Sequence, residues 1–98
     1  MYTKENKVVA LSEDHKPDDE NELKRIEQAG GIVAEGRING NLNLSRAIGD
    51  LEFKNNKALK ANEQLIIAEP DVVMRNFDKT EQFFLMGCDG IWELKNAE

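Results

Sequence analysis

The chain has 98 residues, enough for one domain and too few for two packed cores. It carries 13 lysines and arginines against 19 aspartates and glutamates, a net charge of -6, and residues 12–35 alone hold eight acids and three bases. Nucleic-acid phosphates are bound by clustered lysine and arginine, so this balance argues against a nucleic-acid partner. An apolar share of 40% is within the range of globular domains.

Cysteine usage and the pattern of apolar runs indicate the compartment. The single cysteine, Cys88, excludes an internal disulfide and fits a reducing environment. No apolar run approaches the ~18 residues of a membrane helix, and the first residues lack the apolar centre of a signal peptide. We therefore expect no membrane partner and an intracellular protein, cytoplasmic or nuclear.

The first half of the chain predicts a strand followed by a helix. Residues 8–11 are apolar and β-branched, which predicts a strand that runs into a turn at Pro17. Asp19 and Glu22 have the spacing of a capping box, which predicts a helix start. The apolar residues that follow are spaced for one helical face: Leu23, Ile26 and Ala29. The helix is predicted to end at the glycine pair Gly30 and Gly31.

A hairpin is predicted around residues 39–41, which begin with the turn dipeptide Asn-Gly. A two-residue loop would mix apolar and polar side chains on both faces. A three-residue loop pairs Ile38 with Leu42 instead. It also pairs Gly36 with Leu44, so that one face becomes apolar, and we expect this longer loop.

Further strands are predicted over residues 65–68, 72–74 and 83–88. The last run is continuously apolar, which is typical of a strand buried on both faces. Within it, Cys88 is expected to be an inert buried thiol. Trp92, which follows shortly after, is most simply a core residue.

Two aspartates come directly after predicted strands, where metal ligands and catalytic carboxylates are often found. Asp89 follows the most apolar run and precedes Gly90, although Asp-Gly is also an ordinary turn. Asp14 follows the first strand, and alone it is more simply a turn or cap residue. His15 is the only histidine, which excludes a zinc site built from several histidines.

Five sequence blocks occur together in one order: Ser-Glu-Asp-His-Lys-Pro at 12–17, Arg-Ile with Ala-Gly-Gly within 25–31, Arg-Ile-Asn-Gly and Leu-Ser-Arg-Ala-Ile-Gly-Asp within 37–50, Glu-Pro-Asp at 69–71, and Cys-Asp-Gly-Ile-Trp-Glu at 88–93. In order and spacing they resemble the type 2C metal-dependent protein serine/threonine phosphatases. The resemblance covers nearly the whole chain, and the combination is more specific than any single block.

The resemblance implies an α+β fold, a four-layer αββα sandwich of two antiparallel sheets flanked by helices. Residues 1–98 would form the middle-to-late portion of an incomplete catalytic domain, because the family's first metal block and its downstream Asp-Asn block are not in this sequence. The implied enzyme removes phosphate from phosphoserine and phosphothreonine proteins. It uses two or more Mg²⁺ or Mn²⁺ ions and a metal-activated water.

Carried over residue by residue, the resemblance assigns Asp89 to a metal ligand and Asp14 to an additional, weaker metal site. It places Arg46, Asp50 and Gly90 near the active site. No catalytic step is assigned within this chain: an arginine at position 46 could orient neighbouring loops or meet substrate.

With so few metal ligands, the isolated chain is expected to be inactive. Strands cut from a sandwich expose unpaired edges and apolar faces, so self-association of the fragment is expected. The alternative function is a non-catalytic phosphatase-like scaffold or interaction module. A plain acidic interaction domain is a third interpretation, which five ordered blocks argue against.

Overall fold

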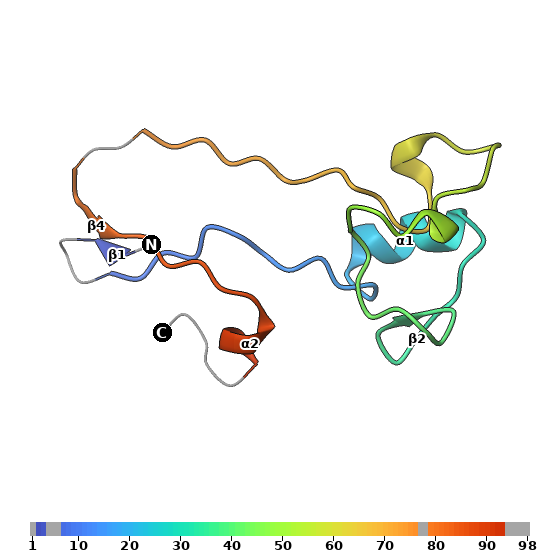
Figure 1. Cartoon of the computed structure of the whole chain (residues 1–98), viewed down its shortest axis with the longest axis horizontal. Helices are drawn as coiled ribbons and strands as arrows, with labels where there is room; N and C mark the ends of the chain where they lie inside the picture. The colour runs from blue at the N-terminus through green and yellow to red at the C-terminus, as the bar shows by residue number, and fades with distance from the viewer. Residues whose placement is uncertain (1, 4–6, 77–78, 94–98) are drawn as a thin grey trace. The chain divides into compact units, whose positions relative to one another are not determined.

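The computed structural model describes residues 2–3, 7–76 and 79–93, which fall into two compact units. Unit 1 comprises the described residues of Met1–Glu13 and Val72–Glu98, and unit 2 is Asp14–Asp71. Helices and short antiparallel strands occur together along the chain (Figure 1). This mixture is consistent with the predicted α+β class.

The predicted helix is present as α1, Glu20–Gln28, but its first turn is not held by a capping box. The Asp19 carboxylate makes no capping bond and instead accepts a hydrogen bond from the Lys16 backbone N–H at 2.8 Å. Glu22, expected to reach back toward Asp19, is only 2% exposed and turns into the interior. The capping-box prediction was therefore wrong in its contacts, although the helix begins where the pattern indicated.

Helix α1 ends at the predicted glycine pair in a Schellman motif. The Gly31 N–H donates to the Ile26 carbonyl at 2.9 Å, and the Gly30 N–H donates to the Glu27 carbonyl at 3.0 Å. Gly30 has a φ of 85°, a left-handed conformation that glycine adopts without strain. At Gly31 an added Cβ would lie 2.5 Å from Leu65 Cδ2. The Leu65 side chain is therefore too close to residue 31 for any side chain to fit there without a shift.

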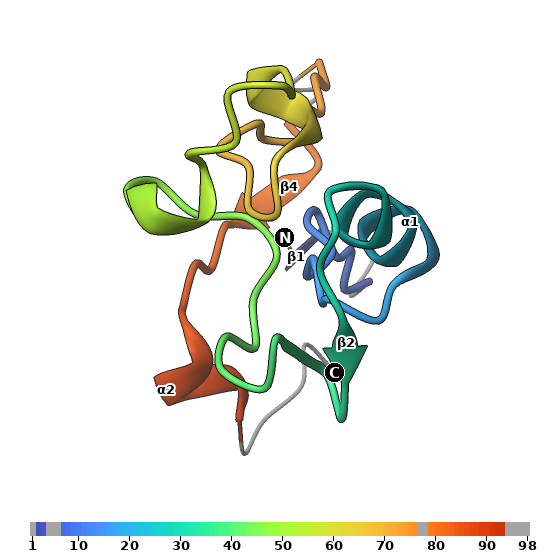
Figure 2. The same ribbon diagram turned by 90° about the vertical axis from the view of Figure 1, so that its right-hand side faces the viewer.

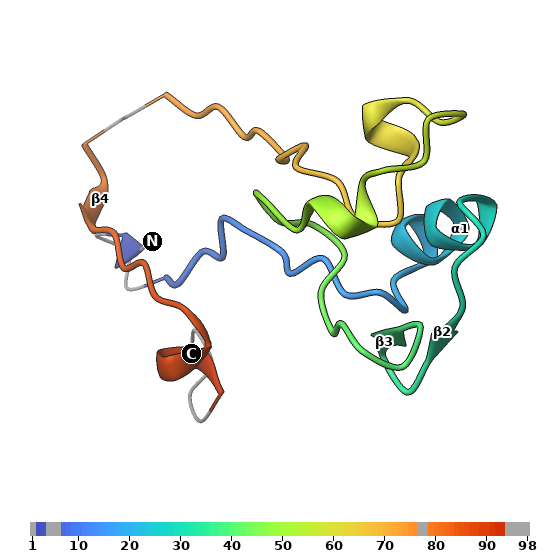
Figure 3. The ribbon, with the colours of Figure 1, turned by 45° about the vertical axis from the view of Figure 1, so that its right-hand side comes forward.

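The hairpin region contains a turn at residues 35 and 36 that was not predicted. Strands β2, Val33–Ala34, and β3, Arg37–Ile38, pair antiparallel through a two-residue turn (Figure 3). Both turn residues, at 35 and 36, have positive φ, which matches the twist of a tight hairpin. The predicted pairing of Ile38 with Leu42 is confirmed. The predicted pairing of Gly36 with Leu44 was wrong, since Gly36 lies in the turn.

The core of unit 2 is small and consists of isoleucines from separate segments. Ile26, Ile38 and Ile66 are fully buried, and Ile67 is 5% exposed. Partly buried apolar side chains surround them: Val33, Leu42, Leu44, Ala47, Phe53 and Leu65. The predicted strand 65–68 is reduced to one parallel bridge between Ile67 and Arg46.

Two 3-10 helices complete unit 2: η1, Leu51–Phe53, and η2, Ala61–Glu63. Helix α1 contacts both η2 and β2. Figure 2 shows β2 below α1. The side chain of Gln64, which is 5% exposed, makes hydrogen bonds to the segment between the two 3-10 helices. Its Oε1 accepts the Asn56 N–H at 3.1 Å, and its Nε2 donates to the Leu59 carbonyl at 3.0 Å.

Unit 1 contains β1, Tyr2–Thr3, paired antiparallel with β4, Glu81–Phe83, and the short helix α2, Asp89–Trp92. Beyond β4, the apolar run is exposed: Phe84 by 57%, Leu85 by 64% and Met86 by 93%. The structure therefore contradicts the prediction of a strand buried on both faces over 83–88. The described part of unit 1, one strand pair and one short helix, offers too little surface to cover this run.

Other predictions for unit 1 also differ from the structure. Cys88 is exposed instead of buried, and Trp92 is 36% exposed instead of lying in a core. Residues 72–74 form no regular strand, and of residues 8–11 only Val8 makes a β-bridge. Across the residues that the structure describes, no helix is long and apolar enough to cross a membrane.

The close passage at Gly31 gives a testable prediction. Gly31→Ala should lower the free energy of unfolding by about 1–3 kcal/mol, because the new methyl group must displace the side chains of Leu65 and Ile26. Urea unfolding followed by circular dichroism measures this change. Ala58→Ser adds one atom at an exposed position and is the control. Equal stability of the two variants would contradict the packing.

Candidate functional site

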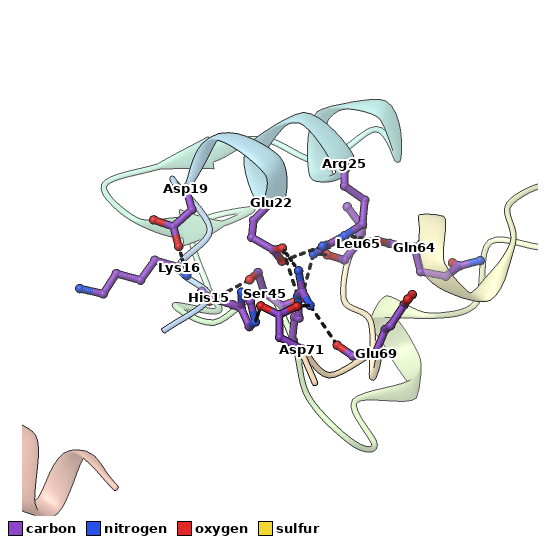
Figure 4. A network of polar contacts seen from close by, with 11 residues as sticks. His15, Lys16, Asp19, Glu22, Arg25, Ser45, Gln64, Leu65, Glu69 and Asp71 are labelled. Atoms are coloured by element: carbon purple, nitrogen blue, oxygen red, sulfur yellow. Dashed lines mark hydrogen bonds and ion pairs between the residues drawn. The ribbon is translucent and has the colours of Figure 1, made fainter. Parts of the chain in front are cut away.

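The predicted site residues are divided between the two units. Asp14, Arg46 and Asp50 belong to unit 2, whereas Asp89 and Gly90 belong to unit 1. In unit 2, Arg46 belongs to a polar network that reaches His15, the residue next to Asp14. Figure 4 shows this network, with Glu22, His15 and Asp71 labelled. Asp50 instead precedes η1 with a left-handed backbone, φ 48°. Asp89 is exposed at the start of α2.

The centre of the network is the buried carboxylate of Glu22 on α1. Its Oε1 accepts hydrogen bonds from Arg46 Nη2 at 2.6 Å and Arg46 Nε at 3.1 Å. Its Oε2 accepts a hydrogen bond from Arg25 Nη1 at 2.6 Å. One acid therefore binds two arginines, one from its own helix and one from the loop after the hairpin.

Arg46 connects α1 to the segment that leaves unit 2. Beside its two bonds to Glu22, its Nη1 donates to the Glu69 carbonyl and to Asp71 Oδ1, each at 3.1 Å. Its side chain is 20% exposed. With four hydrogen bonds to protein groups, this guanidinium is engaged in holding loops together.

Arg25 forms a second link from α1 to the core loops. Its Nη2 donates to the Ser45 carbonyl at 2.9 Å, and its Nε donates to the Gln64 carbonyl at 3.2 Å. Ser45 adjoins the parallel bridge between Arg46 and Ile67, and Gln64 lies three residues before Ile67. The two arginines therefore fix the same pair of loops from two directions.

The network ends at His15, the neighbour of Asp14. His15 Nε2 lies 3.3 Å from Asp71 Oδ2, and the His15 carbonyl accepts a hydrogen bond from the buried Ser45 hydroxyl at 2.8 Å. Figure 4 shows His15, Ser45 and Asp71 gathered below α1. The structure thus links Asp14 to Arg46 through two residues.

The charged groups in this network change one another's pKa. Burial by itself would raise the pKa of Glu22, but interactions with Arg46, Ser45 and Arg25 outweigh it and lower the pKa to about 2. The hydrogen bond to Glu22 raises the pKa of Arg46. The Glu22 carboxylate therefore stays ionised down to strongly acidic pH.

The donor chemistry of the two candidate ligands suits Mg²⁺ or Mn²⁺, which prefer carboxylate oxygens. Both Asp14 and Asp89 are exposed and accessible to an ion. Among the described residues, no group of three or more His, Cys, Asp or Glu is arranged to hold a metal. The two aspartates are thus suitable single ligands, and a complete coordination sphere would need further oxygen donors.

Three members of this network were not predicted as such: Glu22, Arg25 and Asp71. The three-residue spacing of Glu22 and Arg25 marks them as a possible helical ion pair, and this local signal could have been used. Nothing local pairs Arg46 with Asp71, which lie 25 positions apart in the chain.

Replacing the central acid should remove a pH-dependent part of the stability. A folded-state pKa of about 2, below the ordinary value of 4.5, gives a contribution that is present above about pH 4.5 and lost as pH falls toward 2. At about 1.4 kcal/mol per pKa unit, this is roughly 3–4 kcal/mol. Glu22→Gln should be less stable than the wild type by this order at neutral pH, with the difference shrinking below pH 4.5.

Urea unfolding of both proteins across this pH range measures the difference. Glu20→Gln, on the exposed side of the same helical turn, is the control and should show little effect. A stability gap for Glu22→Gln that stays constant from neutral pH to the acid end would contradict the assigned pKa.

Comparison with known proteins agrees with the sequence blocks. The family model described as Protein phosphatase 2C matches residues 1–98. "Protein phosphatase 2C 1" of Paramecium tetraurelia is 58% identical over 88 residues, which is 90% of this chain and 29% of the relative. "Probable protein phosphatase 2C 60" of Arabidopsis thaliana is 47% identical over 98 residues, which is 100% of this chain and 28% of the relative.

A solved structure gives the same result. The crystal structure of a phosphatase from Toxoplasma gondii superposes with a TM-score of 0.63 at 50% identity, over 64% of this chain and 20% of that one. The chain spans about a third of the length of the curated relatives it matches. Since the family match extends over every residue, the chain belongs to the protein phosphatase 2C family.

Proposed function

We propose that the protein containing this chain is a metal-dependent protein serine/threonine phosphatase that acts on phosphoserine and phosphothreonine proteins. The observation that carries this proposal is the family match over residues 1–98, which includes both candidate metal-binding aspartates. Because the chain covers only about a third of its relatives, the remaining metal ligands and the rest of a four-layer sandwich would lie in other parts of the protein. We place this protein inside the cell.

In this proposal Asp89 and Asp14 each supply carboxylate oxygen to Mg²⁺ or Mn²⁺. When bound, such ions lower the pKa of a coordinated water and neutralise charge on a phosphoryl group. The side chains of this chain hold the ions and orient the loops that carry the ligands. Asp89 opens α2 directly after the apolar run, and Asp14 is attached to the network through His15.

Arg46 is proposed to orient loops instead of binding substrate. Its hydrogen bonds to Glu22, Glu69 and Asp71 support this role, because the guanidinium faces acids and a carbonyl of its own chain. Asp50 and Gly90 are proposed to lie near the active site of the complete domain through their positions in the matching blocks.

The second candidate is a non-catalytic phosphatase-like scaffold, and for the isolated chain one observation favours it. The chain spans about a third of its curated relatives and contains two candidate metal ligands, so we propose that it is inactive alone. Its exposed apolar residues, among them Met86 and Met74 at 93% and 91%, would also favour self-association. Turnover by the complete protein separates the enzyme from the scaffold.

Asp89→Asn tests the catalytic proposal in the complete protein. Removing one ligand charge should lower Mn²⁺-dependent hydrolysis of a phosphoserine peptide by more than about a hundredfold while the fold survives. Glu93→Gln, an exposed acid in the same segment, should keep its activity. Unchanged turnover in Asp89→Asn would exclude Asp89 as a ligand.

Asp14→Ala tests the weaker metal position. The Mn²⁺ concentration needed for half-maximal activity should rise, while the free energy of unfolding changes by less than about 0.5 kcal/mol because the side chain is exposed. A metal titration of activity beside a urea titration measures both quantities. If the metal profile does not move, Asp14 is only a turn residue.

A further inference from the structure

The chain enters unit 2 at Asp14 and leaves it at Asp71, and a side-chain contact joins these two ends. His15 Nε2 and Asp71 Oδ2 are 3.3 Å apart, although the residues are 56 positions apart in the sequence. The contact therefore ties the loop that carries Asp14 to the segment that follows the core.

The loop at Asp14 is held at three points, all on its C-terminal side. The His15 side chain meets Asp71, the His15 carbonyl accepts the Ser45 hydroxyl at 2.8 Å, and the Lys16 N–H donates to Asp19 Oδ2 at 2.8 Å. Two of these points fix the backbone of residues 15 and 16. The contact with Asp71 is the third point, and it joins this loop to the segment that leaves unit 2.

Asp71 is an exposed residue with an unusually constrained carboxylate. Its side chain is 66% exposed, yet Oδ1 accepts Arg46 Nη1 at 3.1 Å while Oδ2 faces His15. Arg46 is in turn anchored on the buried Glu22. Exposed ion pairs contribute at most about 1 kcal/mol to folding, so the effect of this carboxylate should lie in placement more than in stability.

We infer that Asp71 is a positioning residue for metal binding: it holds His15, and thereby the loop that presents Asp14, with Arg46 and Glu22 fixing its own position. This inference rests on the proposed function, which assigns Asp14 to a metal. Replacing a residue that contacts and orients a metal ligand commonly lowers metal affinity by about tenfold or more.

The test is a titration of the complete protein with Mn²⁺ alone, in which the electron paramagnetic resonance signal of free Mn²⁺ reports binding. Asp71→Asn should weaken the lowest-affinity site by about tenfold, and His15→Gln should weaken it similarly. Both changes break the same contact between His15 and Asp71. The double variant should therefore bind Mn²⁺ about as tightly as the weaker of the two single variants. Asp71→Glu, which keeps the charge, should bind more tightly than Asp71→Asn.

Two controls separate positioning from structure. Asp18→Asn changes an exposed aspartate near the same loop and should titrate like the wild type. Gly31→Ala should destabilise unit 2 through the core and leave Mn²⁺ affinity unchanged. The inference is overturned if Asp71→Asn titrates like Asp18→Asn, if the two single effects simply add, or if Gly31→Ala weakens binding as much.

Hydrolysis is measured separately, so the two proposals can fail independently. A wild type that binds Mn²⁺ but does not hydrolyse a phosphoserine peptide would refute the proposed enzyme, while the titrations would still decide the role of Asp71. A wild type that binds no Mn²⁺ would overturn the inference directly.

Discussion

The arrangement of unit 2 depends on the buried carboxylate of Glu22. A carboxylate that is 2% exposed is costly unless charged groups bind it, and removal of one partner of such a pair is strongly destabilising. Arg25 and Arg46 satisfy it, and each arginine also holds backbone carbonyls or a carboxylate on distant loops. One buried charge therefore requires helix α1 and three loop segments to stay together.

This polar arrangement compensates for a small apolar core. Ile26, Ile38 and Ile66 are the fully buried members of the core cluster, and the strands around them are two residues long. Such short strands provide few ladder hydrogen bonds. Hydrogen bonds from arginine, serine and glutamine side chains to loop carbonyls therefore hold segments that in a larger sheet would be held by backbone pairing.

The same network bears on function because it ends beside a candidate metal ligand. The blocks that contain His15, Arg46 and Asp71 are brought into contact, so three separate parts of the family pattern serve one local structure. Asp89 belongs to unit 1, whose apolar residues are largely exposed. A chain about a third as long as its relatives thus organises one candidate ligand in a folded loop and carries another on a short helix.

The sequence by itself determined the family, helix α1 with its glycine stop, and the pairing of Ile38 with Leu42, because these depend on residue order and on contacts within a few positions. Only the tertiary structure decided that Glu22 turns inward to two arginines and that Asp71 meets His15. Those choices depend on loops far apart in the chain. Local sequence patterns likewise did not predict that Cys88 and Met86 are exposed, because burial depends on which other parts of the fold cover a segment.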